Sequence, residues 1–374
     1  MNNTSICTIP QILREGFTNF VLTNFFSKMN LFRKEVFENV FKVMNCKKGL
    51  GFSKYQCPNH PSHIKYVPFT CKSRSCPSCG VKATNEWSTW INDSFPNKPV
   101  FHITYTIPDD LHKFFFDNRK YLKFLLTSAG EAMTSWFSDR DYGVPAVTSV
   151  LHTSGSKLNW HPHVHMLISC GSLRDSKWII RNSIPESVIH NRFKAILLKY
   201  LRPFFEGDLH RIYSKRWYCH IKKIENIKVT INYISRYIKH PPIGQSRITF
   251  YNKKLVSFIY KDYREDTNKE LTCSVSDFIH LFISHIPSKH QKHISHFGLM
   301  ANRVFRKFQF ILKRLGLLPK KSLSFNFRDS ILRFTGSDPL VCPFCSSVLE
   351  FISFDFSSNS FFPSILFRFF PLCS

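Results

Sequence analysis

The stretch His161-Pro162-His163-Val164-His165-Met166-Leu167-Ile168 decides the fold expected for the middle of this chain. Two histidines separated by one bulky apolar residue, within an apolar run, indicate a β-strand. Side chains alternate between the two faces of a strand, so His163 and His165 share one face while Val164 points to the other. Two imidazoles on one face of a sheet provide half of a site for a divalent metal ion.

A third histidine ligand is expected from the preceding strand. The segment 146–152 is rich in β-branched residues and predicts a strand, and Ser154-Gly155-Ser156 predicts the turn into the histidine strand. His152 then reaches the same face, and a cage of three histidines leaves a metal ion free to act as a Lewis acid. A hydrogen-bonded structural role for His152 is an equal alternative, and His161 and His102 are rival ligands.

Two tyrosines downstream complete a possible catalytic set. Tyr233 and Tyr237 lie four residues apart and share a face if their segment is helical. Such pairs are more often packed than reactive, but Arg236, Lys239 and Arg247 bring positive charge to this segment, and we predict that they bind DNA. A phenol with a pKa of about 10 attacks only when a metal ion polarises the phosphate and cations stabilise the phenolate. These residues therefore suggest metal-assisted transfer of a DNA phosphate onto tyrosine.

Cysteine and histidine form two short knuckles in the N-terminal part of the chain. Their sequences are Cys57-Pro-Asn-His60 and Cys76-Pro-Ser-Cys79, and this spacing suits one tetrahedral Zn²⁺ site. We therefore predict that structural zinc is bound by Cys57, His60, Cys76 and Cys79.

The metal ligands have several alternatives. The spacing leaves open whether Cys46, His63 or Cys71 replaces one of the four predicted zinc ligands or builds a second site. A further knuckle, Cys342-Pro-Phe-Cys345, is followed only by the distant Cys373, so by itself it is weak evidence for a metal.

The chain carries a large excess of positive charge. Its 374 residues include 52 Lys and Arg against 25 Asp and Glu, a formal net charge of +27. Nucleic acid is the natural partner of such a chain. A membrane partner is not expected, because no stretch contains the roughly eighteen apolar residues of a spanning helix. Basic residues in or beside the knuckles predict contacts with DNA phosphates; they are Lys65, Lys72, Arg74 and Lys82.

The cysteine pattern indicates a cellular compartment. The N-terminus lacks the basic and apolar regions of a signal peptide, and the cysteines are clustered rather than dispersed. Clustered cysteines favour metal binding in a reducing environment. We therefore expect a cytoplasmic protein.

The order of predicted elements indicates an α+β fold with an antiparallel sheet. Apolar spacing predicts helices over 9–43, 86–95, 121–137, 278–286 and 300–315, and strands over 101–107 and 146–152. Four parts are expected. Residues 1–95 form a helical, zinc-binding and DNA-binding domain, 96–265 hold the histidines and the two-tyrosine helix, 266–330 form a basic helical region, and 331–374 contain the Cys-x-x-Cys motif and a Phe/Ser-rich tail.

Taken together, these residues resemble the two-tyrosine HUH transposases of bacterial rolling-circle insertion sequences, the insertion sequence ninety-one family. HUH denotes His, hydrophobic, His and is matched by 163–165, while the family's paired tyrosines are matched by Tyr233 and Tyr237. The segment 68–79 is similar to the family's cysteine-rich domain. Further similar segments are 151–155, 236–248, 285–289 and 296–303, so the resemblance covers roughly residues 46–345.

The resemblance implies an HUH nuclease domain that cleaves and rejoins single-stranded DNA at insertion-sequence ends through a 5′-phosphotyrosine link, with Mg²⁺ or Mn²⁺ at the histidines. The family usually has a cysteine where His60 stands, so His60 and His63 compete for that ligand role. The tail after Cys345 matches nothing in the family. The alternatives are a nicking endonuclease of the replication-initiator or relaxase type, and a catalytically decayed zinc-ribbon DNA-binding remnant.

Overall fold

The computed structural model describes residues 7–96, 99–225, 241–262, 264–319, 328, 332 and 336–356. Within them the chain combines helices with three antiparallel sheets, which confirms the α+β class. None of the helices in these residues is long and apolar enough to cross a lipid bilayer.

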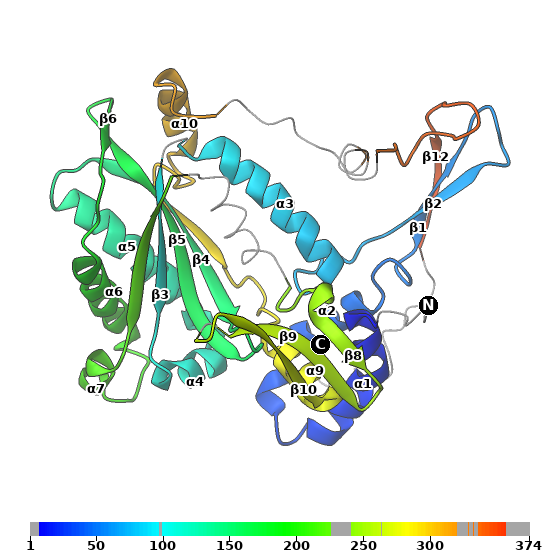
Figure 1. The fold of residues 1–374 in the computed structure, drawn as a ribbon, viewed down its shortest axis with the longest axis horizontal. Coiled ribbons are helices and arrows are strands. Elements are labelled where there is room, and N and C mark those ends of the chain that lie inside the picture. Colours follow the sequence, from blue (N-terminus) through cyan, green and yellow to red (C-terminus); the bar gives the residue numbers. More distant parts are fainter. Residues whose placement is uncertain are drawn as a thin grey trace.

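The largest sheet contains the histidine strand and lies on the left of Figure 1. Its strands follow the order β11-β4-β5-β3-β7, and β6 pairs with β5. Every neighbouring pair is antiparallel. The strands are β3 (Val100–Thr106), β4 (Val144–Ser154), β5 (Trp160–Arg174), β6 (Lys177–Ile180), β7 (Tyr218–Ile224) and β11 (Ile294–Gly298).

Helices cover both faces of this sheet. On one face, Ile103 and Val164 are buried with residues of α5 and α6. On the other face, Val150 and Leu167 are buried with Trp87 of α3 and with residues of α10. Because β5 is covered on both sides, its sequence is apolar at most positions instead of alternating with polar residues. The helices around the sheet are α3 (Pro77–Ser94), α4 (Asp110–Asp117), η2 (Arg119–Tyr121), α5 (Leu122–Ser138), α6 (Glu186–Leu201), α7 (Leu209–Ser214) and α10 (Phe305–Arg314).

A second body packs three helices against a small sheet (Figure 1, bottom). Helix α1 begins after Thr8, whose side chain caps the amide of Gln11, and has proline in its first turn. The strand order of the sheet is β10-β9-β8, and one apolar core joins α1, α2, α9 and β9. The elements are α1 (Ile9–Asn24), η1 (Met29–Leu31), α2 (Lys34–Met44), η3 (Gln245–Arg247), β8 (Ile248–Tyr251), β9 (Leu255–Asp262), β10 (Thr267–Ser274) and α9 (Val275–Ser284).

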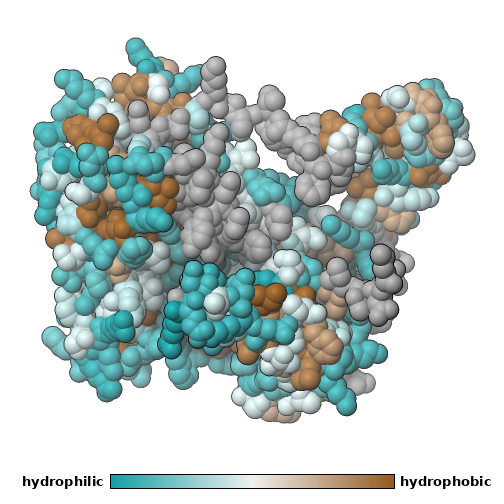
Figure 2. Space-filling model, in the orientation of Figure 1, coloured by the Kyte–Doolittle hydropathy of each residue, from teal (hydrophilic) through white to brown (hydrophobic). Residues whose placement is uncertain are grey.

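A third, smaller lobe joins parts of the chain that are far apart in sequence. Strands β1 (Phe52–Gln56) and β2 (Ile64–Pro68) form a hairpin, and β12 (Glu350–Asp355) pairs with β1 on its other edge. This lobe projects at the upper right of Figure 1, and Figure 2 shows hydrophobic residues gathered on its surface. Tyr66, Phe351 and Phe354 are among its exposed aromatic side chains.

Most predicted helices and strands are confirmed. The predicted helical segment 9–43 contains α1 and α2, the predicted strands correspond to β3 and β4, and the predicted helices 121–137, 278–286 and 300–315 correspond to α5, α9 and α10. Helix α3 begins at Pro77, earlier than expected, because proline is favoured in the first helical turn. The segment 46–79, for which no helix or strand was predicted, contains β1 and β2.

The structure divides the chain differently from the four expected parts. The region 266–330 is not simply helical, because it contains β10 and β11. Strand β11 pairs with β4, and its Phe297 packs so closely on Gly130 of α5 that an added Cβ would lie 2.2 Å from the ring. The histidine sheet therefore continues beyond residue 265. The C-terminal part 331–374 is not separate either, since β12 pairs with β1 near the N-terminus.

Candidate functional site

Three histidines converge on one face of the large sheet. His152 of β4 lies directly opposite His163 of β5 in the strand register, and His165 is two residues further along β5. The ring centroids of His152 and His163 are 5.0 Å apart, and those of His163 and His165 are 4.9 Å apart. One ring nitrogen from each of the three lies within 4.8 Å of the others. This arrangement can hold one divalent ion.

Hydrogen bonds orient two of these rings. Nδ1 of His163 lies 2.7 Å from the carbonyl oxygen of His161 and donates to it. Nδ1 of His165 lies 3.0 Å from Nε2 of His102 and 3.3 Å from Oγ1 of Thr104. Because these contacts use Nδ1 of each ring, Nε2 is the nitrogen that would bind a metal ion. Histidine ligands are commonly fixed through their second nitrogen in this way.

Burial keeps the three imidazoles neutral. It lowers the pKa of His163 to about 4, and it lowers the pKa values of His152 and His165 well below the usual value. Nearby histidines lower these pKa values further through charge repulsion. Only the neutral imidazole can bind a metal ion, so the rings are in the binding form at neutral pH.

The rival histidines have other positions. His102 contacts His165 through its own Nε2 and stands behind it instead of beside the other two rings. His161 belongs to a neighbouring group with Asp109 and His112. Of the three candidates for the third ligand, the structure brings His152 to His163 and His165.

The positively charged side chain of Arg74, from the cysteine-rich segment, lies in a pocket beside His152. Arg74 lines this pocket together with His152, Pro242, His285 and His293. Its positive charge contributes to the lowered pKa values of His152 and His293. The sequence indicated only that Arg74 is one of several basic residues near the knuckles. Its position beside the histidines depends on how the loop between Cys71 and Cys76 folds back onto the sheet.

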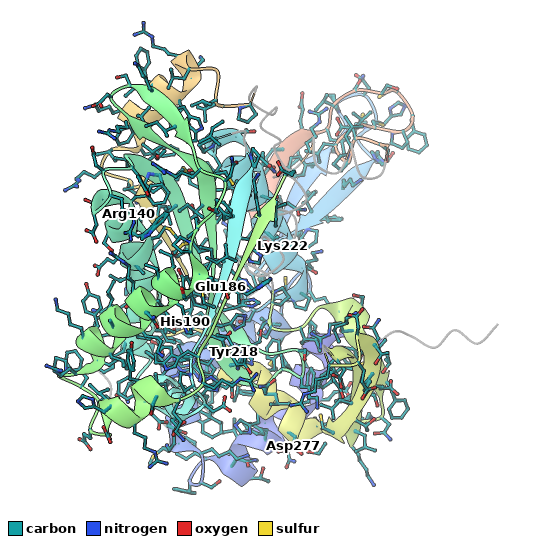
Figure 3. The ribbon with its side chains drawn as sticks, turned by 60° about the vertical axis from the view of Figure 1, so that its left-hand side comes forward. Arg140, Glu186, His190, Tyr218, Lys222 and Asp277 are labelled. Atoms are coloured by element: carbon teal, nitrogen blue, oxygen red, sulfur yellow. The ribbon has the colours of Figure 1, made fainter. Side chains whose placement is uncertain are left out.

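Strand β7 adds polar residues to the histidine face, which the sequence interpretation missed. Tyr218, His220 and Lys222 lie opposite Thr106, Thr104 and His102 of β3, and directly opposed residues share a face. Figure 3 shows Tyr218 and Lys222 along this strand. The alternation of polar and apolar residues over 218–222 was the signal that could have identified the strand.

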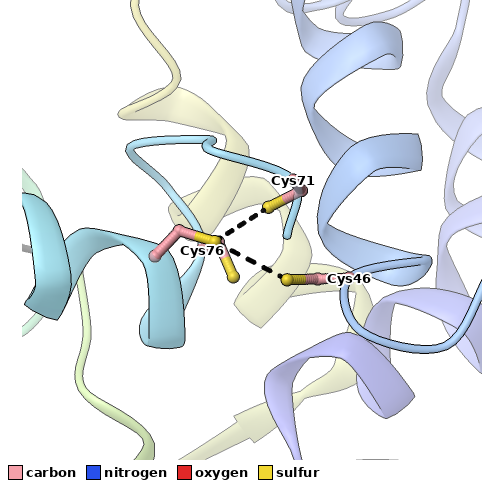
Figure 4. A group of neighbouring side chains, drawn as sticks. Cys46, Cys71 and Cys76 are labelled. Atoms are coloured by element: carbon pink, nitrogen blue, oxygen red, sulfur yellow. Dashed lines mark hydrogen bonds between the residues drawn. The ribbon is translucent and has the colours of Figure 1, made fainter. Parts of the chain in front are cut away.

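The predicted zinc ligands are divided between two groups, so the predicted single site was wrong. Cys76 and Cys79 lie with Cys46 and Cys71, and Figure 4 shows Cys46, Cys71 and Cys76 close together. The Sγ atoms of Cys46 and Cys71 are each 3.6 Å from that of Cys79. Two sulfurs of a tetrahedral zinc site are separated by about 3.8 Å when each Zn–S bond is about 2.3 Å. This four-cysteine cluster joins the end of α2 to the start of α3.

Cys57 and His60 lie in a different group, with Cys342 and Cys345. The β1–β2 hairpin carries the first knuckle into the small lobe, away from the start of α3 where Cys76 lies. His63 is outside both groups, and its ring contacts Phe344 instead. Of these two histidines, the structure brings His60 to the cysteines.

The tyrosines lie outside the described residues, as do Arg236 and Lys239. Of the three predicted DNA-binding residues, Arg247 alone is described. Its Nε donates to the carbonyl oxygen of Ile259 and its Nη2 to that of Ser156, both at 2.6 Å. These bonds attach the β4–β5 turn to β9, so Arg247 has a structural role. DNA binding by all three residues stays a prediction.

Two family models match the chain. One, described as a putative transposase, matches residues 146–307, and the other, described as a transposase zinc-binding domain, matches residues 17–107. The transposase for insertion sequence element IS801 of Pseudomonas savastanoi pv. phaseolicola is 33% identical over 336 residues, which cover 83% of this chain and 82% of that protein. The putative transposase y4qJ of Sinorhizobium fredii is 25% identical over 319 residues, covering 76% and 80%. No solved structure matches significantly.

The zinc-binding match and the four-cysteine cluster support the same conclusion. All four cysteines of the cluster lie within the matched residues 17–107, and their sulfur separations suit a tetrahedral ion. Together they support structural Zn²⁺ in this part of the chain.

Proposed function

Because the chain belongs to the IS91 family of transposases, we propose that it cleaves and rejoins single-stranded DNA at insertion-sequence ends through a 5′-phosphotyrosine intermediate. Family membership establishes a DNA-cleaving transposase. The single-strand substrate, the divalent ion and the attacking tyrosines are the proposal. The observation that carries it is the convergence of His152, His163 and His165 on one face of the sheet.

The three histidines suit a divalent ion that acts on phosphate. An imidazole set favours Mn²⁺ over Mg²⁺, since Mg²⁺ prefers oxygen ligands and keeps several waters. The bound ion would polarise a phosphodiester oxygen and neutralise charge as the reaction proceeds. His102 and Thr104 would keep His165 correctly oriented for this task.

The covalent step belongs to the tyrosines. In our proposal the phenolic oxygen of Tyr233 or Tyr237 attacks the phosphorus, an O–P bond forms, and the bond from phosphorus to the 3′ oxygen breaks. The phenol loses its proton and the departing 3′ oxygen gains one, which leaves a free 3′-hydroxyl. The phosphotyrosine ester keeps the energy of the original phosphodiester, so a second 3′-hydroxyl can reverse the step. Two tyrosines allow two strand ends to be held.

Described residues on either side of the tyrosine segment support this assignment. The segment follows β7, which shares the histidine face, and the chain after it includes Pro242, which lines the pocket with His152. Arg74 and Lys222 supply positive charge at this face for the DNA backbone.

A covalent-capture experiment tests the proposal. Single-stranded oligonucleotides from the ends of the element, labelled at the 3′ or the 5′ terminus, are incubated with protein and Mn²⁺ and separated on a denaturing gel. We expect the 3′-labelled strand to migrate with protein and the 5′-labelled fragment to run free. Cleavage that persists in EDTA would contradict the role of the metal ion.

Tyrosine variants identify the nucleophile. Tyr233→Phe/Tyr237→Phe should eliminate the adduct, because phenylalanine keeps the ring but lacks the attacking oxygen. Tyr218→Phe is the matched control, since Tyr218 is an exposed tyrosine on the histidine face. An adduct that survives the double change and disappears in Tyr218→Phe would assign the chemistry to Tyr218 and refute our assignment.

A further inference from the structure

We propose that Cys57, His60, Cys342 and Cys345 form a second zinc site, which fastens the C-terminal part of the chain to the β1–β2 hairpin. The matched zinc-binding domain ends at residue 107, so half of this ligand set lies outside it. The four ligand atoms lie within 4.8 Å of one another. The site shares no residue with the four-cysteine cluster and does not depend on the proposed tyrosine chemistry.

The distances fit a tetrahedral ion. The Sγ atoms of Cys57 and Cys345 are 3.5 Å apart. Nδ1 of His60 lies 3.8 Å from Sγ of Cys57 and 3.9 Å from Sγ of Cys342. Zinc bonds of about 2.3 Å to sulfur and 2.0 Å to nitrogen place tetrahedral ligand atoms about 3.5 to 3.8 Å apart. A disulfide would require about 2.05 Å between sulfurs, and all three cysteines are free thiols.

Each pair of ligands lies on a tight turn, as zinc knuckles do. In the first, the amide of His60 donates to Sγ of Cys57 at 3.3 Å. In the second, the amide of Ser346 donates to the carbonyl of Cys342, and Ser346 has a positive φ of 58° that reverses the chain. Asn59 of the first knuckle donates to Ser347 of the second at 2.8 Å, so the two turns also contact each other directly.

The lobe has almost no core apart from these ligands. Its buried cluster consists of Cys57, Cys342 and Leu349, with Tyr55 and Cys345 packed against it. Cys57 is 1% exposed and Cys342 is fully buried. So small a unit cannot bury enough apolar surface to fold alone, and metal binding commonly supplies the missing free energy in such cases.

The site closes a very long loop. Cys57 and Cys345 are 288 positions apart, and β12 pairs with β1 next to them. Two ligands come from the β1–β2 hairpin and two from the C-terminal segment. These two parts of the chain must therefore meet before the zinc ion is fully coordinated. The sequence suggested no further metal ligands near the C-terminal Cys-x-x-Cys motif. In the structure, Cys57 and His60 take that role beside it.

Zinc content of the full-length protein tests the proposal. All proteins in this test carry His163→Ala/His165→Ala, which removes the histidine site. The parent protein with this background, purified from zinc-supplemented medium, should contain about two zinc ions per chain, one for each cluster. Cys342→Ser/Cys345→Ser should contain about one. Cys273→Ser is the control and should contain two, because Cys273 is a partly exposed cysteine outside both clusters. One zinc in the parent protein, or two after Cys342→Ser/Cys345→Ser is added, would overturn the proposal.

A second pair of variants covers the case in which the double variant misfolds. His60→Cys replaces one zinc ligand by another and should keep both ions, whereas His60→Ala should lose one. Hydrogen exchange of the wild-type protein provides a structural readout. Amides of β12 should be protected with zinc bound and should exchange at least about ten-fold faster in His60→Ala, while those of β5 stay protected. Equal zinc content and equal exchange in the two His60 variants would refute the site.

Discussion

Mutation of the two residues behind His165 should weaken metal binding without touching a ligand. Nδ1 of His165 contacts Nε2 of His102 at 3.0 Å and Oγ1 of Thr104 at 3.3 Å. Loss of a partner behind a metal-ligating histidine typically reduces metal affinity 10- to 100-fold, or about 1.4 to 2.7 kcal/mol. Each partner can replace the other in part, so the effect should depend on whether one or both are removed.

We expect His102→Leu to weaken Mn²⁺ binding by about 10-fold, since Thr104 still accepts the Nδ1 hydrogen. His102→Leu/Thr104→Val should weaken it by about 100-fold, because Nδ1 of the buried His165 then lacks both partners. Thr106→Val is the matched control. Thr106 lies on the same strand and face but opposite His163, whose Nδ1 bonds to the carbonyl of His161.

Electron paramagnetic resonance of free Mn²⁺ in the absence of DNA measures this affinity independently of activity. Far-ultraviolet circular dichroism establishes that each variant is folded. A folded double variant with wild-type Mn²⁺ affinity would refute the assignment of His165 as a ligand. An equal loss in Thr106→Val would show that the effect is a general disturbance of the sheet.

Three further predictions concern stability and DNA binding. Tyr105→Phe should raise the free energy of unfolding by about 1 to 3 kcal/mol, measured in urea, because the buried Tyr105 hydroxyl lacks a hydrogen-bond partner among the described residues. Burial lowers the pKa of His296 to about 4. Between about pH 6.5 and 4 the unfolded chain therefore binds a proton at His296 that the folded chain does not bind, so the free energy of unfolding falls as the pH is lowered. His296→Leu should remove about 3 kcal/mol of that decrease. DNA affinity should fall steeply with salt, and Arg74→Gln should reduce the slope of log affinity against log salt by about 0.7 if Arg74 contacts one phosphate; an unchanged slope would exclude that contact.

Local patterns were sufficient to predict the histidine strand. The two-residue repeat assigns His163 and His165 to one face, whatever surrounds the strand, because alternation is a property of extended backbone itself. The turn residues 154–156 also predicted that β4 and β5 form a hairpin, which made His152 a candidate before its position was known. In the same way, knuckle spacing predicted cysteines and histidines that could bind a metal ion, and net charge predicted nucleic acid as the partner.

The grouping of ligands was decided by tertiary structure alone. Cys76 joins Cys46 and Cys71, while Cys57 joins two cysteines near the other end of the chain. Spacing along the chain restricts which residues can share a turn, but it does not restrict which turns meet. That choice follows from the packing of α2 against the start of α3 and from the pairing of β1 with β12. For the same reason no local signal could indicate that Arg74 lies beside His152.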